Sequence, residues 1–333
     1  MMRMTVLASG SKGNSAVISS SRTRVLVDAG LSCRELMKRM VLAGEDPAAL
    51  DAILITHEHQ DHVAGLGVLA RKLGVPVYLT EPTHRAWVRM LTPRTTMSYA
   101  QWLDHVQREK EARAHAASAV SADAEPGLCD SMSAAVESSS SSPDSAEPEE
   151  QELEAAQKPS AKADPTYLPA VEYFRSGSQF SIGDIEITPF TIPHDAADPC
   201  GFVFASEGVR MAVATDLGYM PPNVKTALKR IDVLLLESNH DLEMLKDGPY
   251  PWSVKQRVLS RVGHLSNLAT AEFLERDYDG AAAYIVLGHL SESNNAPELA
   301  RLSAEQALMN HPTLLGNRIL LAEQTAPLAP ISL

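Results

Sequence analysis

The sequence has little of what marks secreted or membrane-embedded proteins. It contains only three cysteines, Cys33, Cys129 and Cys200, and their positions show no paired spacing. An odd number of cysteines without pairing favours a reducing compartment over a disulfide framework. No uninterrupted run of about 18 apolar residues is present, so we expect no transmembrane helix, and the N-terminal residues show no signal-peptide pattern. We therefore expect a cytoplasmic protein without a membrane partner.

Basic residues are also scarce, because 29 Lys and Arg stand against 42 Asp and Glu, for a formal net charge of −13. Ten of the acidic residues lie between positions 116 and 157, where there is no Lys or Arg, and removing these ten charges leaves −3 for the rest of the chain. A nearly neutral remainder neither favours nor excludes a nucleic-acid partner. Any binding of phosphate would have to come from local side chains and metal ions.

Large apolar residues almost disappear between positions 107 and 164, where Ala, Ser, Glu and Pro dominate. A segment of this composition cannot bury a core, so we predict a disordered insert at 107–164. Strand-like segments resume directly behind it, at 171–174 and 185–190. The insert therefore interrupts one domain, and we expect a single domain over residues 1–333.

The most informative stretch is 51–62, where an apolar, β-branched run predicts a buried strand that ends at Thr56. Four potential metal ligands follow within six positions: His57, His59, Asp61 and His62. His57 and His59, two apart in extended chain, project to the same side, so one pair can hold one metal ion and the second pair an adjacent one. The alternative is a polar loop that caps a helix. Three histidines in so short a loop favour the metal site.

Three strands of the second half also end in residues that bind metals: His194, Asp216 and His289. Each is weak evidence alone, because an aspartate at a strand end is usually a turn residue. With the stretch 51–62 they complete two sets of ligands. One set is His57, His59 and His194; the other is Asp61, His62 and His289; Asp216 would bridge them. Imidazole-rich sets with a few carboxylates suit Zn²⁺, and also Mn²⁺ or Fe, so we expect two divalent metal ions.

Two residues near the N-terminus are candidates for supporting this site. Asp28 ends the predicted strand 24–27 and could orient a metal-bound imidazole, although alone it would read as a turn residue. The loop 9–15 is rich in glycine and serine but lacks the Gly-Lys-Ser/Thr of a P-loop, and strand rather than helix follows it. We expect its tight turn to bring Asn14 near the site.

Predicted strands and helices follow one another in both halves of the chain. The second half predicts strands at 202–205, 210–214, 233–236 and 283–287, and helices at 223–230, 253–262 and 267–276. Two packed sheets with helices outside would satisfy both halves, which is an α/β (α+β) architecture.

The order Asp28, His57-x-His59-x-Asp61-His62, His194, Asp216, His289 resembles the metallo-β-lactamase superfamily in all five of its usual motifs. The resemblance spans nearly the whole chain apart from the insert. It implies a four-layer αβ/βα sandwich with a dinuclear site at one edge of the two sheets. His59 stands where flavo-diiron oxygen reductases have glutamate, which argues for hydrolysis over redox chemistry. The bridging carboxylate of Asp216 resembles the glyoxalase-II, ribonuclease-Z and nuclease branches more than true β-lactamases.

Finer features are similar to the WalJ (YycJ) type within that superfamily, namely residues 9–15, 193–199, 237–241, 248–252, 263–267 and 288–295. Small bacterial members of this type are regarded as single-stranded DNA 5′ exonucleases. The resemblance implies a phosphodiesterase that acts on single-stranded DNA through a metal-bridging hydroxide. The chain departs from that type in its insert, and it lacks the β-CASP domain of larger nuclease relatives. How a strand would be held is therefore left open.

Two residues are candidates for direct catalysis. Asp61 could both ligate a metal and orient the nucleophile. His264, placed by Gly263 in an Asn-capped turn ahead of a helix, could donate a hydrogen bond to phosphate or protonate the leaving oxygen. The alternative for His264 is a polar residue that merely precedes a helix.

Weaker candidates for lining the site or binding substrate are His240 and Ser266. His240 could equally be a plain turn residue. Tyr250 and Trp252 could stack on bases, although aromatic residues flanked by prolines are as often packing residues.

Two other functions remain open at this point. A small-molecule hydrolase of the same fold, such as a thioesterase, lactonase or cyclic phosphodiesterase, would use the same metal ligands, because the loops decide the substrate. A non-catalytic binding protein could use the acidic insert as an interaction tail. The complete ligand set argues against this second alternative.

Overall fold

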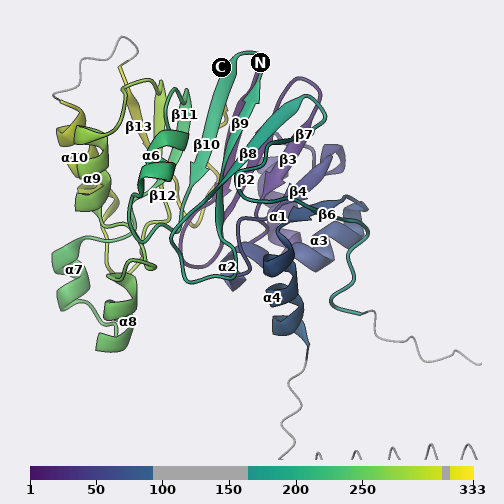
Figure 1. Cartoon of the computed structure of the whole chain (residues 1–333), viewed down its shortest axis with the longest axis horizontal. Helices are drawn as coiled ribbons and strands as arrows, with labels where there is room; N and C mark the ends of the chain where they lie inside the picture. The colour runs from purple at the N-terminus through teal and green to yellow at the C-terminus, as the bar shows by residue number, and fades with distance from the viewer. Residues whose placement is uncertain (93–163, 310–315) are drawn as a thin grey trace, which may run out of the picture. The chain divides into compact units, whose positions relative to one another are not determined.

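The computed structural model describes residues 1–92, 164–309 and 316–333 (Figure 1). Residues Met1–Thr92 and Asp164–Leu333 form one compact unit. The predicted insert at 107–164 lies outside the described residues, apart from Asp164, so the insert and the single-domain organisation stay predictions. Within the described ranges, no helix combines the length and the apolar character needed to cross a membrane.

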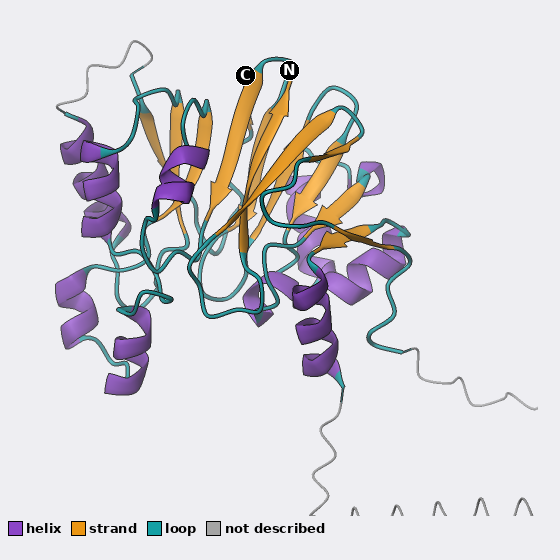
Figure 2. Cartoon of the chain, viewed as in Figure 1, coloured by secondary structure: helices purple, strands orange, loops and turns teal. Residues whose placement is uncertain are grey.

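Two seven-stranded sheets organise this unit (Figure 2). The strands of the first sheet, in spatial order, are β14 (Ile331–Ser332), β1 (Arg3–Ala8), β2 (Ser15–Ser19), β3 (Arg24–Val27), β4 (Ala52–Leu54), β5 (Val77–Leu79) and β6 (Val171–Tyr173). Those of the second are β13 (Arg318–Leu321), β12 (Tyr284–Gly288), β11 (Val233–Glu237), β10 (Val209–Ala214), β9 (Cys200–Ser206), β8 (Ile185–Thr191) and β7 (Phe180–Ile182). Chain order and spatial order nearly coincide, so most neighbouring strands are also consecutive in the chain.

The strands are apolar on both faces, and alternate residues enter different cores. In β11, Val233 and Leu235 join the core between the sheets, whereas Leu234 and Leu236 join the core on the outer face. Ile53 of β4 likewise enters the outer core of the first sheet. Burial on both faces is what a period of two predicts for strands in the middle of a layered domain.

Helices cover the outer face of each sheet. The α-helices of the described ranges are α1 (Cys33–Leu42), α2 (Gln60–Val63), α3 (Leu66–Leu73), α4 (Glu81–Leu91), α6 (Pro222–Ala227), α7 (Leu242–Asp247), α8 (Trp252–Val258), α9 (Asn267–Arg276) and α10 (Pro297–Leu308), with a 3₁₀ helix at Pro47–Ala49. Apolar side chains of α1, α3 and α4 pack on the first sheet, and those of α6, α9 and α10 pack on the second. The resulting order of layers is helix, sheet, sheet, helix, which confirms the expected αβ/βα sandwich.

The predicted elements are present with small changes at their ends. The helix expected at 253–262 ends at Val258, because the chain turns at Leu259 and leads into the loop before α9. The turn before α9 is capped by Ser266 rather than by asparagine, since the Ser266 hydroxyl accepts a hydrogen bond from the Ala269 amide. The hairpin strand β7, the edge strands β13 and β14, and the helices α7 and α10 were not anticipated.

The strands that precede the candidate ligands end at one edge of the sandwich. β3 and β4 run parallel in the first sheet, and β10, β11 and β12 run parallel in the second. The loops behind parallel strands meet at the same edge, which is where ligand sites of such sheets form. This topology brings residues from both halves of the chain together.

Candidate metal centre

Three residues of the candidate site leave their strands in the left-handed backbone conformation. Asp28 follows β3 with a φ of 59°, Asp216 follows β10 with 63°, and His289 follows β12 with 54°. This conformation costs an L-residue about 1–2 kcal/mol, and such strain persists where the surroundings fix it, commonly at functional sites. Its recurrence at three strand ends marks this edge as a built site.

The first set of three histidines comes together across the two sheets. The Nδ1 atom of His59 lies 3.1 Å from the Nε2 atom of His194, and the ring of His57 has its centroid 4.6 Å from that of His59 and 5.0 Å from that of His194. One nitrogen from each ring fits within a span of 4.8 Å. Glu58 ties the two loops together, because its Oε1 atom accepts a hydrogen bond of 2.9 Å from the Ala197 amide.

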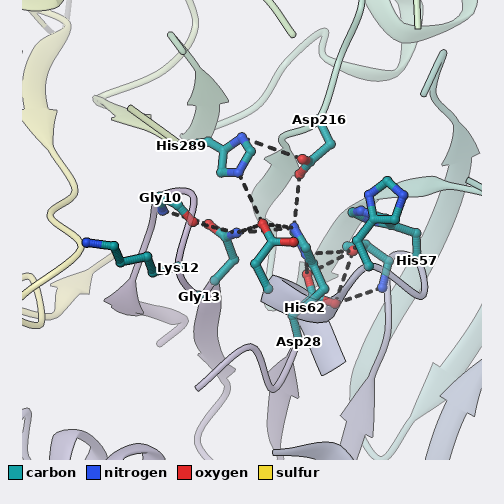
Figure 3. A network of polar contacts seen from close by, with 12 residues as sticks. Gly10, Lys12, Gly13, Asp28, His57, His62, Asp216 and His289 are labelled. Atoms are coloured by element: carbon teal, nitrogen blue, oxygen red, sulfur yellow. Dashed lines mark hydrogen bonds and ion pairs between the residues drawn. The ribbon is translucent and has the colours of Figure 1, made fainter. Parts of the chain in front are cut away.

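The second set consists of Asp61, His62 and His289. The Oδ2 atom of Asp61 lies 3.4 Å from the Nε2 atom of His62 and 3.5 Å from the Nε2 atom of His289. Figure 3 shows His62, from the motif behind β4, and His289, from the end of β12, approaching each other. The ligand atoms of this set also lie within 4.8 Å of one another.

Asp216 lies between the two sets. Its Oδ2 atom is 3.4 Å from the Nε2 atom of His62, and its Oδ1 atom is 3.8 Å from the Nε2 atom of His194 and 3.5 Å from the Nδ1 atom of His289 (Figure 3). Only 2 % of the residue is exposed. A buried carboxylate that faces both sets is placed as a bridging ligand would be.

The two supporting candidates from the N-terminal region lie next to His62. The Oδ2 atom of Asp28 is 2.8 Å from the Nδ1 atom of His62, and the Thr56 amide donates to Asp28 Oδ1 over 2.9 Å. The amide nitrogen of Asn14 lies 3.2 Å from Asp61 Oδ2 and 3.1 Å from His62 Nε2. Asp28 thereby fixes the orientation of the imidazole, as carboxylates commonly do behind metal-binding histidines.

Glu237, at the end of β11, has a role that the sequence did not reveal. Its Oε1 atom lies 2.8 Å from the Nδ1 atom of His264 and 2.8 Å from the Nδ1 atom of His289. Its Oε2 atom accepts hydrogen bonds from the amides of Leu217 and Leu265. One fully buried carboxylate therefore orients two imidazoles. A glutamate that ends an otherwise apolar strand was the available signal.

Burial and nearby charge act in opposite directions on the histidines. Burial opposes the charged form of His62, but the carboxylates of Asp216, Asp61 and Asp28 outweigh it and raise the pKa of His62 well above its usual value. The pKa of His289 is also raised well above its usual value, chiefly by Asp216 acting against burial. Burial lowers the pKa of His57 and of His194, and the neighbouring imidazoles contribute to both shifts. The carboxylates beside His62 and His289 therefore favour positive charge at the second set of candidate ligands.

The donor set fits divalent metal ions. Burial opposes ionisation of Asp216 and Glu237, yet the surrounding histidines lower the pKa of both. Within the described ranges, neither carboxylate has an ion pair with Lys or Arg. The buried atoms His57 Nε2, His289 Nε2 and Asp216 Oδ2 have no hydrogen-bond partner. Buried anionic groups need compensating charge, and unpartnered imidazole and carboxylate atoms that face one another are metal-ligand chemistry.

A pocket of about 340 Å³ opens over this cluster. His59, Asp61, Asp216, His264 and His289 form its floor and inner wall. The outer wall contains Ser11, Gln60, Asn239, Ser291, Tyr250, Arg257 and Val258. A substrate in this pocket would contact both candidate metal sets and His264.

Two of the sequence candidates do not join the cluster. His240 is 1 % exposed, both of its ring nitrogens lack a hydrogen-bond partner, and burial lowers its pKa to about 4. It lies behind the pocket, whose wall is formed by its neighbour Asn239. Ser266 serves as the N-cap of α9. The small, buried Cys200 is an inert thiol, because burial raises its pKa to about 12.

Comparison with known proteins identifies the family. A profile of the metallo-beta-lactamase superfamily matches residues 9–289. The chain belongs to this superfamily. Among relatives of this metallo-β-lactamase-fold chain are "Exodeoxyribonuclease WalJ" of Streptococcus pneumoniae, 32% identical over 90% of this chain and 86% of the relative, and "Exodeoxyribonuclease YycJ" of Bacillus anthracis, 33% identical over 92% and 89%. Both likenesses confirm the expected superfamily and subgroup.

Solved structures agree on the fold. The Zn²⁺-bound PqqB of Methylobacterium extorquens superposes with a TM-score of 0.59 at 14% identity, over 98% of this chain and 99% of that one. At so low an identity the likeness concerns the fold alone. The superfamily implies divalent metal ions, and the clusters described above are placed to bind them.

Proposed function

We propose that this protein is a dinuclear-metal-dependent phosphodiesterase that removes nucleotides from an end of single-stranded DNA. The observation that carries the proposal is the position of Asp216 between two sets of ligand atoms, at the floor of a pocket that also contains His264. The names of the two exodeoxyribonuclease relatives, which align over about nine-tenths of the chain, support DNA as the substrate.

In this proposal His57, His59 and His194 hold one ion, Asp61, His62 and His289 hold the other, and Asp216 contacts both. Bound divalent ions of Zn, Mn or Fe would lower the pKa of water and neutralise charge on the phosphate. The chain's own part is to fix these ligands. Asp28 orients His62, and Glu237 orients His289.

Two side chains are positioned to act on the reacting atoms. Asp61 is only partly buried, at the pocket surface, where its carboxylate can orient the attacking water. The Nδ1 atom of His264 is engaged by Glu237, which leaves Nε2 free to contact the phosphate or to protonate the leaving oxygen.

The pocket volume also favours a second candidate, a hydrolase of small molecules. About 340 Å³ lies near the lower end of the range for pockets that hold one drug-sized ligand. Such a pocket would serve a thioester, a lactone or a cyclic phosphodiester as well as one terminal nucleotide. A cytoplasmic location is proposed as well, since Cys33 and Cys200 are both free thiols, which a reducing compartment permits.

The test is digestion of single-stranded DNA labelled at its 5′ end, with Mn²⁺, with Zn²⁺ and with EDTA, beside Asp61→Asn. Metal-dependent release of labelled nucleotides by the wild type, and loss of that release in the variant, is the expected result. Absence of cleavage by folded, metal-loaded protein would contradict the nuclease proposal and favour the small-molecule hydrolase. Release from the unlabelled end first would contradict the 5′ direction alone.

A further inference from the structure

The pocket holds about one nucleotide, so the remainder of a DNA strand must cross its rim. This inference rests on the proposed nuclease function. The rim beside α8 is formed by Tyr250, Arg257 and Val258. Between residues 248 and 271 the chain contains three basic residues and no acidic one, in a protein whose formal charge is −13. This side of the rim is therefore the best matched to a polyanion.

Arg261, in the turn that follows α8, has its charge available. Its guanidinium lies 4.3 Å from the centre of the Tyr219 ring, and no ion pair joins it to an acidic residue within the described ranges. Two basic residues nearby differ from it, because Arg257, which lines the pocket, is paired with Asp195, and Lys12, next to the pocket residue Ser11, is paired with Glu292. A guanidinium stacked on an aromatic ring is held in one plane, and its free donors match the geometry of a phosphate.

The backbone that carries Arg261 is fixed to the loops of the metal centre. The Val262 carbonyl accepts a hydrogen bond of 3.2 Å from the Asp195 amide, and the Gly263 carbonyl lies 3.2 Å from His194 Nδ1. At Gly218, two residues behind Asp216, a Cβ atom would lie 2.2 Å from the Arg261 carbonyl oxygen. Close approach at Gly218 therefore sets the distance between Arg261 and the candidate bridging carboxylate.

We propose that Arg261, held against Tyr219, binds a backbone phosphate of the DNA strand outside the pocket. The contact lies beyond the phosphodiester that is cleaved, so it acts on strand binding and leaves the chemistry of the pocket untouched. In the same stretch of chain Val254 and Val262 are 38% and 42% exposed and offer apolar surface of the kind that contacts sugars or bases.

The chain offers a matched control for this contact. Arg318 also lies over a tyrosine ring, that of Tyr284, at 5.8 Å. Tyr284 begins β12, whereas His289 follows the end of that strand, so the Arg318 pair lies at the opposite end of the sheet. Arg261→Ala and Arg318→Ala each remove one arginine from an aromatic ring and change the net charge equally.

Binding of fluorescent oligothymidylates with phosphorothioate linkages, which resist cleavage, is measured on the metal-loaded protein over a series of salt concentrations. For Arg261→Ala we expect affinity for a dodecamer to fall roughly five- to tenfold at low salt, and the slope of log K against log salt to decrease by about 0.7, the value for one phosphate contact with a single strand. Affinity for a mononucleotide, which the pocket accommodates, is expected to stay unchanged. Arg318→Ala should match the wild type on both substrates.

Equal slopes for Arg261→Ala and wild type would overturn the proposal, as would an equal loss in both variants or failure of the wild type to bind any oligothymidylate. Light scattering tests whether a second copy of the chain, rather than DNA, binds at Arg261. An altered oligomeric state in Arg261→Ala would identify a contact between copies and overturn the DNA contact. Nucleotide release is assayed separately with Mn²⁺. Normal Arg261-dependent binding without release would contradict the proposed nuclease and leave the strand contact supported.

Discussion

The two sheets contribute to the candidate centre in different ways. The first sheet provides four candidate ligands from one loop behind β4, where local backbone geometry sets their spacing. The second sheet provides one residue from each of several strand ends, so their spacing depends on strand register. In that register Ala214 pairs with Leu236, and Leu236 pairs with Leu287. The neighbouring strand ends therefore hold Asp216, Glu237 and His289 together only once the sheet has formed.

The largest effect is expected at Asp216, where the contributions of the two sheets meet. Asp216→Asn removes the charge that faces both sets of ligands. We expect nucleotide release to fall about a thousandfold or more, the scale for losing a preorganised electrostatic group, together with a loss of bound metal. Asp277→Asn, which alters a surface carboxylate paired with Lys225, should change neither quantity. Full activity in Asp216→Asn would exclude it as a bridging ligand.

The next largest effect concerns His264. This residue lies in the loop before α9, a helix that packs on the second sheet, and the described part of the first sheet has no counterpart to it. If it protonates the leaving oxygen, His264→Ala should lower turnover about a hundredfold while the metal content stays full. His84→Ala, on α4 beside Tyr173, is the matched control. Unchanged turnover would remove His264 from the mechanism, and a parallel loss of metal would make it a ligand.

A smaller effect is expected at Glu237, which acts through other residues. In the wild type the Glu237 carboxylate contacts two imidazoles through one oxygen and two backbone amides through the other. In Glu237→Gln an NH₂ group replaces one of these oxygens and faces one of the two pairs. Loss of such an orienting carboxylate typically costs about 10- to 100-fold in metal affinity or activity. Metal affinity is measured with turnover, beside the exposed Glu243→Gln. If only thermal stability fell, Glu237 would be a structural residue.

The smallest effect is expected at Asp184, whose hydrogen bonds connect a turn of the second sheet to the first sheet, away from the candidate metal centre. Asp184, in the β7–β8 turn, accepts hydrogen bonds of 2.6 Å from Ser20 and from Thr23, beside β2 and β3. These bonds lower the pKa of Asp184 to about 2. A lowered folded-state pKa stabilises the protein above about pH 4 and loses that contribution as the pH falls towards 2.

Asp184→Asn should therefore lower the melting temperature slightly at neutral pH, without changing activity. The difference from wild type should shrink as the pH falls below about 4. Thermal unfolding followed by circular dichroism at several pH values measures it. A difference that stays constant with pH would mean that the hydrogen bonds of Asp184 do not depend on its charge.

The same contrast between the sheets explains what could be predicted from the sequence. The candidate ligands from His57 to His62 could be predicted because they lie close together in the sequence, directly behind a β-branched run that predicts a strand. Glu237 escaped because its role depends on His264 and His289 lying within reach, which only the folded sheet establishes. His240 could not be decided from the sequence for the same reason, because its burial and its absence from the pocket lining follow only from the fold.

The edge strands and α10 escaped prediction for a different reason. Strand β14 is only two residues long, and β13 acquires its strand conformation by pairing with β12. Helix α10 buries three alanines, Ala300, Ala304 and Ala307. Small residues leave little apolar periodicity to read, although alanine is the best helix former.

The central claim is that two metal ions are held jointly by the two sheets. Counting bound metal per chain in wild type, His194→Ala and His289→Ala tests it directly, because each variant removes the second sheet's histidine from one set only. We expect two ions in the wild type and selective loss of one in each variant. A single ion in the wild type, or two ions retained in both variants, would contradict the claim.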